Sequence, residues 1–285
     1  MGEAKQRKNK LLDAQVPCIF CGGNAIATTE EHCPPRALFR DKQWPEGYVF
    51  PACHPCNGGS SNDDLMVAFL AKLQPGANAE TLNKGSGLMR MVHRQFPGLL
   101  QKMMESSAVE ARAQARRLGM RPAPGQTYQE LGIVNVTDAM DECVAAFAAK
   151  LSKAVYYQQT SRIFPVDGSI MFQWFTNAQR IEHGRIALLD GLAGLAAMSP
   201  PKQRAGKDLK DQFDYLYSQG ENGELHVLQV VFGEVFGFVT IFSPVPGRLE
   251  AMEDRLKARA GRDDSPFRFL GDRTATEQNP GPPEA

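Results

Sequence analysis

Two short stretches decide how the N-terminal part of this chain folds: CIFCGGNAIATTEEHCPP at residues 18–35 and FPACHPCNGG at residues 50–59. Each contains one Cys-x-x-Cys pair, and the four cysteines are Cys18, Cys21, Cys53 and Cys56. Two such pairs supply four thiolates, which is the ligand number of a closed tetrahedral zinc site. The sequence therefore predicts a structural zinc ion that joins the two stretches.

The composition is that of an ordinary soluble globular protein, with 42% hydrophobic and 22% charged residues. No apolar run is long enough to span a membrane, and the polar, basic N-terminus lacks the apolar core of a secretion signal. We therefore expect a cytoplasmic protein, in which paired cysteines bind metal more often than they form disulfides. The formal net charge is zero, so any surface that binds nucleic acid must come from local clustering of basic residues.

Changes in residue pattern divide the chain into four segments. We expect a basic flexible arm over residues 1–15, a zinc-containing module over 16–73, a body over 74–270 and a disordered tail over 271–285. Helical spacing of apolar residues predicts helices over 63–73, 87–106 with a break at Pro97-Gly98, 106–120, 137–162 and 246–262. Alternation with a period of two predicts strands over 169–176, 212–219, 224–233 and 235–243, the last two joined in a hairpin at Gly233-Glu234. The expected class is α+β: a small zinc-stapled module followed by a mixed helical and antiparallel β body.

Between the cysteine pairs lies an acidic residue followed directly by histidine, and an asparagine follows the last cysteine. With the cysteines, this arrangement resembles the zinc-bearing HNH endonucleases, which are ββα-metal nucleases. The matching residues are Cys18, Cys21, Glu31, His32, Pro35, Cys53, Cys56 and Asn57. The resemblance covers about residues 16–66 and does not extend to the body.

The resemblance implies a β-hairpin that carries Glu31 and His32 and packs on a short helix starting near Asn57. It implies hydrolysis of DNA phosphodiester bonds to products with 5′-phosphate and 3′-hydroxyl ends. His32 would be the general base, because an imidazole with the ordinary pKa of about 6.5 is largely neutral at pH 7. Glu31 and Asn57 would offer hard oxygen ligands to one Mg²⁺ or Mn²⁺ ion, which neutralises charge on the phosphate and the leaving oxygen.

One residue departs from the family pattern: Tyr48 stands where the asparagine that orients the histidine is expected. A backbone carbonyl or the Tyr48 hydroxyl would then have to hold His32. Two alternative functions follow, a zinc-containing module that binds nucleic acid or protein without turnover, and a ribonuclease or toxin-like effector.

Several further residues are candidates for a surface contact, a metal ligand or the core. Arg112, Arg116 and Arg117, with Arg121 nearby, form either a solvated helix face or a weak nucleic-acid contact. Asn62 and Asp63 are further candidate ligands, Glu30 a solvent-facing charge, and His54 an exposed residue. The core is expected to contain Cys33, Cys143 and the pairs Tyr156-Tyr157 and Trp174-Phe175. The body, residues 74–270, could contact a partner protein or a second copy of the chain.

Overall fold

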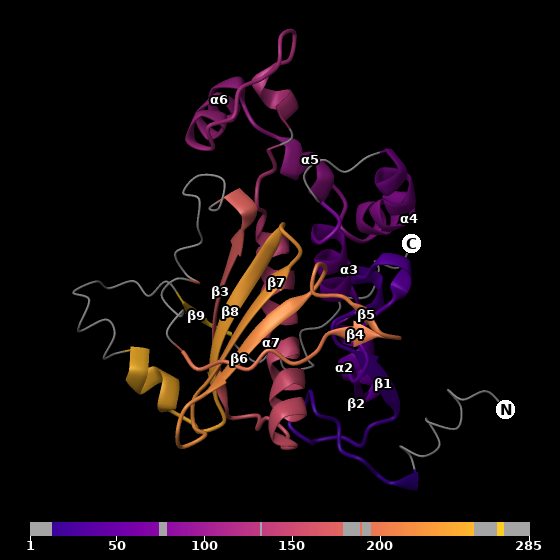
Figure 1. The fold of residues 1–285 in the computed structure, drawn as a ribbon, viewed down its shortest axis with the longest axis vertical. Coiled ribbons are helices and arrows are strands. Elements are labelled where there is room, and N and C mark those ends of the chain that lie inside the picture. Colours follow the sequence, from indigo (N-terminus) through magenta and orange to yellow (C-terminus); the bar gives the residue numbers. More distant parts are fainter. Residues whose placement is uncertain are drawn as a thin grey trace, which may run out of the picture.

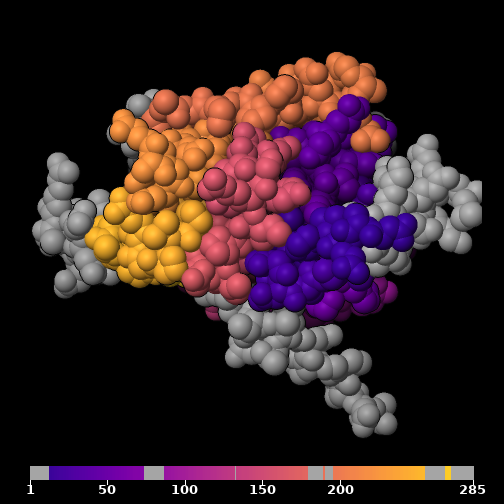
Figure 2. Space-filling view, turned by 90° about the horizontal axis from the view of Figure 1, so that it is seen from below, coloured from indigo at the N-terminus to yellow at the C-terminus, as the bar shows by residue number. Residues whose placement is uncertain are grey.

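The computed structural model describes residues 13–73, 79–131, 133–178, 189, 195–253 and 267–270. In this part of the chain, one long helix, α7 (Asp138–Thr160), lies between a five-stranded antiparallel sheet and an N-terminal hairpin with its helices (Figure 1). The view from below shows the same order, with α7 between the C-terminal strands and the N-terminal unit (Figure 2). A helix buried on two sides can contribute side chains to both neighbours.

The N-terminal unit contains two strands, β1 (Thr29–His32) and β2 (Val49–Ala52), followed by helices α2 (His54–Gly59) and α3 (Ser61–Leu70). The strands are antiparallel, and Glu31 pairs with Phe50 while His32 pairs with Val49. Directly paired residues share one face of a hairpin, and successive residues alternate between its faces. Because Glu31 and Phe50 are buried, they mark the inner face, and His32 lies on the opposite, more open face.

The large sheet has the strand order β6-β7-β8-β3-β9, all antiparallel. Its strands are β3 (Ser169–Thr176), β6 (Asp214–Gln219), β7 (His226–Phe232), β8 (Phe236–Ser243) and β9 (Arg268–Phe269). The Thr137 side chain caps the N-terminus of α7 by accepting from the Met140 N–H, and Ser161 ends the helix in the left-handed region. One hydrophobic cluster runs from Phe50 through Leu151 of α7 to Phe238 of the sheet. The N-terminal unit and the sheet therefore share α7 as a common core layer.

Shorter elements complete the described fold. They are the 3-10 helices η1 (Arg36–Leu38), η2 (Arg40–Lys42) and η3 (Tyr128–Leu131), the helices α4 (Ala79–Gln95), α5 (Leu99–Met104) and α6 (Ala108–Arg117), and the strands β4 (Gln203–Arg204) and β5 (Lys207–Asp208). A reciprocal capping box between Ser107 and Glu110 begins α6. The β4–β5 hairpin leaves the large sheet and reaches the N-terminal unit, as the backbone hydrogen bond from Glu46 N–H to Gln203 C=O shows.

The expected fold class is confirmed at the level of a mixed α+β protein with antiparallel sheets. The predicted strand over 169–176 has the observed bounds, and the hairpin at Gly233-Glu234 is present. The predicted strand over 212–219 begins two residues later, because Gln212 and Phe213 donate their N–H groups to the Leu209 carbonyl in a turn. The β4–β5 hairpin and β9 are too short to leave a periodic signal.

Some predictions fall wholly or partly outside the described residues. These are most of the N-terminal arm (residues 1–12), the tail over 271–285 and the end of the last helix, which is helical over residues 248–253, where the description stops. The boundary between module and body at residue 73 stays a prediction. Among the described residues, every helix is too short or too polar to cross a bilayer.

Candidate functional site

The four cysteine thiols of the two pairs come together in one place. One Sγ atom from each of Cys18, Cys21, Cys53 and Cys56 lies within 4.8 Å of the others. A zinc ion with Zn–S bonds of about 2.3 Å needs sulfur atoms about 3.8 Å apart, so a small contraction of this cluster would close a tetrahedron. Gly22 makes the first knuckle tight, since its φ is +66° and an added Cβ would lie 2.7 Å from Val166 Cγ2. The donor set and its geometry fit a metal such as zinc.

Hydrogen bonds already link these thiols. The pKa of Cys18 is lowered to about 4, first because the Cys56 thiol donates to it and then because backbone groups do so, against the opposing effect of burial. The pKa of Cys56 is raised by the same hydrogen bond and by burial. A bound cation favours the thiolate at all four positions, so metal binding would release the protons that the thiols hold.

Asn57 joins the cysteine cluster to β1. It is the fourth residue of α2, whose N-cap is Cys53, so the helix begins three residues earlier than expected. Its Nδ2 donates to Thr29 Oγ1 at 3.1 Å and to the Glu30 carbonyl at 3.1 Å. No described residue donates to its Oδ1. The amide nitrogen thus anchors α2 to the strand that carries Glu31 and His32, and the amide oxygen keeps its capacity to bind a ligand.

Glu31 ends in a buried ionic cluster whose centre is Lys150 of α7. The Lys150 Nζ lies 2.7 Å from Glu31 Oε1, and 2.9 and 2.8 Å from the two carboxylate oxygens of Asp64. Ser60 Oγ accepts from the same Nζ at 2.8 Å. Only 8% of the Lys150 side chain and 6% of the Glu31 side chain are exposed. Four protein oxygens from β1, α2's end and α3 therefore surround one cation that is contributed by the body of the protein.

Burial and attraction act in opposite directions in this cluster. Burial raises the pKa of Glu31 and the pKa of Asp64, while the Lys150 charge opposes the rise in both. Burial also disfavours the Lys150 ammonium, but the attraction of Asp64, Cys33 and Glu31 outweighs it, and the pKa of Lys150 lies above its ordinary value. When Glu31, Asp64 and Lys150 are all ionised, these three side chains carry one net negative charge. Lys150 therefore compensates only one of the two carboxylates.

The same oxygen set contains the ligand types of a site for a hard divalent cation. Two carboxylates and a hydroxyl within 2.9 Å of one point are the ligand types that Mg²⁺ and Mn²⁺ prefer. The Lys150 ammonium marks that point as a place where a cation is held. The donor set fits such an ion on the condition that Lys150 moves away, because two cations would otherwise be in contact in a buried place.

His32 lies on the other face of the hairpin and contacts Trp44. The two rings meet edge to face, with centroids 4.7 Å apart. The Tyr48 hydroxyl donates to the Tyr215 hydroxyl at 3.1 Å, and its role in holding His32 stays a prediction. The Tyr48 carbonyl accepts from the Cys33 N–H. Trp44 is thus the aromatic partner that fixes the His32 ring.

The structure also places the other residues that were singled out in the sequence. Cys33, Cys143, Tyr156 and Phe175 are buried, and His54 is exposed, as expected. Asn62 is exposed and Asp63 is buried at the start of α3, but the carboxylate that reaches Lys150 belongs to Asp64. Arg112, Arg116 and Arg117 belong to α6, at the far end of the molecule from the β1–β2 hairpin (Figure 1). Their contact with nucleic acid stays a prediction.

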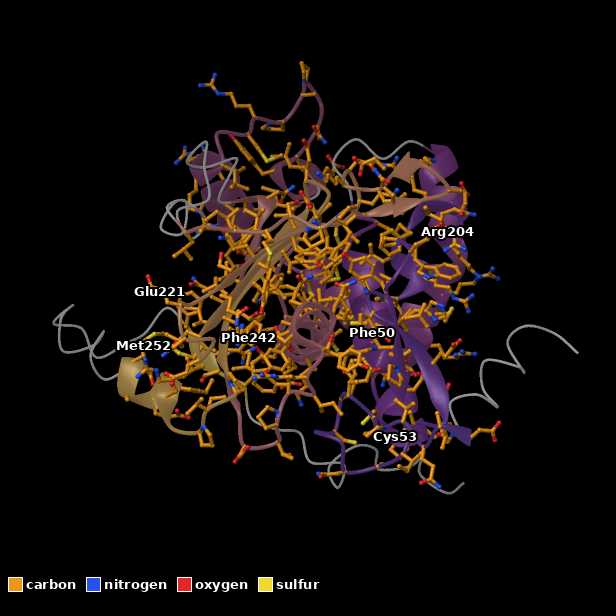
Figure 3. The ribbon with its side chains drawn as sticks, turned by 60° about the horizontal axis from the view of Figure 1, so that its bottom comes forward. Phe50, Cys53, Arg204, Glu221, Phe242 and Met252 are labelled. Atoms are coloured by element: carbon orange, nitrogen blue, oxygen red, sulfur yellow. The ribbon has the colours of Figure 1, made fainter. Side chains whose placement is uncertain are left out.

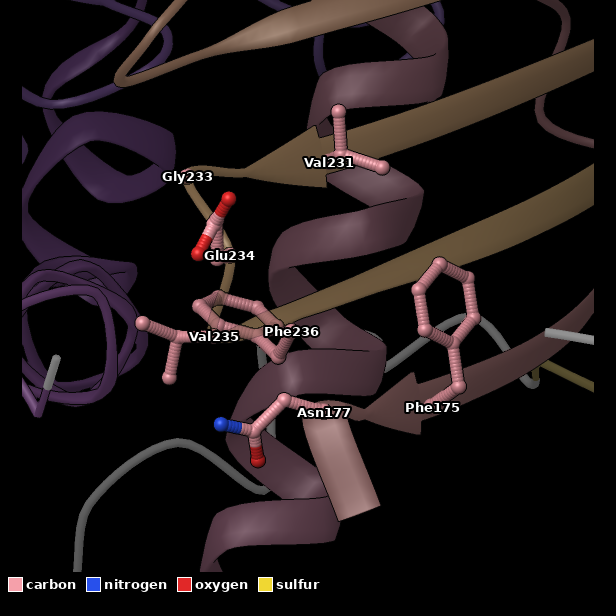
Figure 4. Close-up of a pocket in the computed structure, with 7 residues that line it drawn as sticks. All are labelled: Phe175, Asn177, Val231, Gly233, Glu234, Val235 and Phe236. Atoms are coloured by element: carbon pink, nitrogen blue, oxygen red, sulfur yellow. The ribbon is translucent and has the colours of Figure 1, made fainter. Parts of the chain in front are cut away.

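Two hollows on the surface lie apart from these residues. The hollow at the β7–β8 turn is lined by Phe175, Asn177 and Glu234 among others, and its volume of ≈ 20 Å³ has room for about one water molecule (Figure 4). A wider polar hollow of ≈ 400 Å³ lies between the end of α7 and the β6–β7 turn, near Arg162 and His226. Neither contains a residue of the cysteine or Lys150 clusters.

The chain matches no protein-family model, no curated protein and no solved structure. The function is therefore inferred from the geometry of the site.

Sequence reasoning missed Lys150, Asp64 and Trp44. Lys150 had a readable signal, because it follows Phe147 by three residues and precedes Ala154 by four, which places it on the buried face of α7. A lysine on a buried helix face needs an acidic partner. That partner could not be named from the sequence, because α3 and α7 are far apart in the chain.

Proposed function

We propose that this chain is a zinc-stapled HNH-type endonuclease that hydrolyses phosphodiester bonds of DNA. In the proposal His32 is the general base, the four cysteines hold zinc, and Glu31 binds one Mg²⁺ or Mn²⁺ ion. The observation that carries it is the pair of hydrogen bonds from Asn57 to β1. They hold together the strand bearing Glu31 and His32 and the helix bearing two of the four thiols.

The metal ligands in the proposal are revised by the ionic cluster. Glu31 and Asp64 already place their carboxylates around one cationic centre, and Ser60 adds a hydroxyl. Asp64 therefore joins Glu31 as a proposed ligand, and Asn57, whose amide nitrogen is bonded to β1, stays a further proposed ligand through its amide oxygen. When bound, the divalent ion would supply positive charge to the phosphate and to the leaving oxygen.

The residues of the chain itself would do three things. His32, at the end of β1, would take the proton of the attacking water, which is general-base catalysis by a ring held in place by Trp44. The zinc site would keep β1 and α2 at a fixed separation, so that base and ligands do not drift apart. Lys150 would hold the two carboxylates in position while no divalent ion is bound.

A second candidate function is a zinc-containing module that binds nucleic acid or protein without turnover. Two observations favour it: the Lys150 ammonium occupies the carboxylate pair, and Glu31 and His32 lie on opposite faces of the hairpin. In that case Lys150 would be a permanent structural partner of both carboxylates.

The test is cleavage of supercoiled plasmid DNA by zinc-loaded protein with Mg²⁺, with Mn²⁺ and with neither. His32→Ala is compared with His54→Ala, a matched control in which an exposed histidine of α2 is lost. The nuclease proposal predicts metal-dependent nicking or linearisation that His32→Ala abolishes and His54→Ala retains. Intact DNA in every reaction, or equal cutting by the two variants, contradicts it. The same reactions on RNA of similar length separate a deoxyribonuclease from a ribonuclease.

A further inference from the structure

Two arginines from distant parts of the chain lie against the ring that contacts His32. The guanidinium carbon of Arg204 lies 3.9 Å from the centroid of the Trp44 ring, and that of Arg36 lies 5.1 Å away. Trp44 in turn meets the His32 ring at 4.7 Å. Both guanidinium groups and the proposed general base therefore contact the same indole ring.

The position of Arg204 is set by the β4–β5 hairpin. Its Nη1 donates to the Trp44 carbonyl at 3.2 Å. The Glu46 N–H donates to the Gln203 carbonyl at 2.9 Å, and the Ala205 N–H donates to Glu46 Oε1 at 3.1 Å. These three hydrogen bonds tie the hairpin to the loop that carries Trp44. Figure 3 shows Arg204 on the side of the molecule formed by the N-terminal unit.

The turn of the β4–β5 hairpin helps to hold Arg204 against Trp44. Ala205 has a φ of 48° and Gly206 a φ of 77°, which is the pair of positive φ values of a tight two-residue turn. Alanine rarely adopts that conformation, so its bond to the Glu46 carboxylate helps to hold the turn. The result is a guanidinium that is pre-positioned over an indole, which lowers the entropy lost when it binds an anion.

In the part of the chain that the structure describes, neither Arg36 nor Arg204 forms an ion pair with a carboxylate. The Arg36 side chain is exposed, and that of Arg204 is partly exposed. The acidic group nearest in these contacts, Glu46, accepts from a backbone N–H. In a chain of zero net charge, this is a local positive site on the open face of the hairpin.

We propose that Arg36 and Arg204, stacked on Trp44, form a subsite for the phosphate backbone of the nucleic acid that His32 acts on. Guanidinium groups bind phosphate through paired N–H donors, and a ring stacked against them limits their rotation. The subsite binds a phosphate next to the scissile one and so brings the strand to His32. This inference rests on the proposed nuclease function, but backbone binding can be measured separately from cleavage.

The experiment measures binding of a fluorescein-labelled 30-base-pair DNA duplex by anisotropy, with zinc-loaded protein and no added Mg²⁺ or Mn²⁺. Arg36→Ala and Arg204→Ala are compared with Arg40→Ala, a matched control whose guanidinium is exposed but paired with Asp211 at 2.9 Å. Each of the first two is expected to weaken binding by about tenfold and to reduce the slope of log affinity against log salt by about one. Arg40→Ala is expected to stay within about twofold of the wild type.

A further variant, Arg204→Lys, keeps the charge but loses the planar stacked group and should bind between the wild type and Arg204→Ala. Equal affinity and equal salt slope for the wild type and both alanine variants overturn the subsite, and so does a wild type that does not bind DNA. Plasmid cleavage distinguishes the two proposals. If the wild type cuts DNA and Arg36→Ala and Arg204→Ala bind it as the wild type does, the nuclease proposal is retained and the subsite is rejected. If binding depends on the two arginines but no protein cuts DNA, the subsite is supported and the nuclease proposal is contradicted.

Discussion

Replacement of Lys150 by methionine removes the only cation that contacts Glu31 and Asp64 among the described residues, while it keeps a side chain of similar length. Two carboxylates would then share a buried place without a counter-ion, and removal of one partner from a buried ionic group costs about 3–5 kcal/mol. The folded variant can avoid two buried negative charges by keeping one carboxyl protonated. At pH 7 that protonation costs about 4 kcal/mol for a group whose ordinary pKa is about 4.3. The two costs, about 3–5 kcal/mol for the lost partner and about 4 kcal/mol for the protonation, therefore agree.

Because one carboxyl is protonated in folded Lys150→Met, its loss of stability relative to the wild type should depend on pH. In the variant, the pKa of one carboxyl is raised further above its value in the unfolded chain, so the folded state binds more protons. The free energy of unfolding therefore falls as pH rises, by about 1.4 kcal/mol per pH unit. We expect the difference between wild type and variant to be about 1 kcal/mol at pH 5 and about 4 kcal/mol at pH 7.

The assay is urea unfolding of zinc-loaded protein, followed by tryptophan fluorescence at pH 5, 6 and 7 without other divalent ions. Lys153→Met is the matched control, because Lys153 lies on the same helix and donates to the Phe20 carbonyl at 3.2 Å from a partly exposed place. The expected cost of Lys153→Met is about 1.5 kcal/mol, the lower end for a hydrogen bond from a charged group. Added Mn²⁺ should also stabilise Lys150→Met more than it stabilises the wild type, since no ammonium then occupies the site between the Glu31 and Asp64 carboxylates. Equal stability of the two variants at pH 7, or a difference that does not change with pH, refutes the reasoning.

Three further predictions address the metal centre, a buried histidine and the sheet. Cys56→Ser should lower bound zinc from one equivalent per chain, measured by elemental analysis, while Cys33→Ala, a buried thiol outside the cluster, should retain it. Burial lowers the pKa of His226 to about 4, so the unfolded chain binds more protons between pH 4 and 6.5, and the protein should lose about 3 kcal/mol as pH falls through that window. His226→Gln should flatten this part of the unfolding profile, and an unchanged profile contradicts the assignment. Gly237→Ala should destabilise the sheet by about 3 kcal/mol in thermal unfolding, since its Cβ would overlap the Val230 carbonyl, and an unchanged Tm would show that the backbone relaxes.

Much of the fold could be read from periodicity, because the sheet and α7 obey simple rules. The strand over residues 169–176 is rich in apolar and aromatic residues, and the helix over 137–162 has a continuous apolar stripe, so the predicted ends of both lie within two residues of the observed ends. The β4–β5 hairpin was missed for a physical reason. Its strands have two residues each, and its turn uses Ala205 in a conformation that alanine rarely adopts.

The candidate site was predictable only in part. Cys-x-x-Cys spacing indicates a shared metal without knowledge of the fold, and the four thiols do lie together. The Lys150 partner of Glu31 comes from α7, and the Arg204 guanidinium that lies over Trp44 comes from β4, so neither could be predicted from the local sequence. Both arrive through tertiary packing across α7 and the β4–β5 hairpin, and a sequence pattern confined to residues 16–66 contains no information about either.

The most direct test of the nuclease proposal is the rate of plasmid cleavage in Mn²⁺ by the wild type, His32→Ala and His54→Ala under identical conditions. The proposal predicts that the wild type cuts, that His54→Ala cuts at a similar rate, and that His32→Ala is slower by about 10²-fold or more. A wild type that leaves the plasmid intact, or a His32→Ala variant that cuts as fast as His54→Ala, would contradict it.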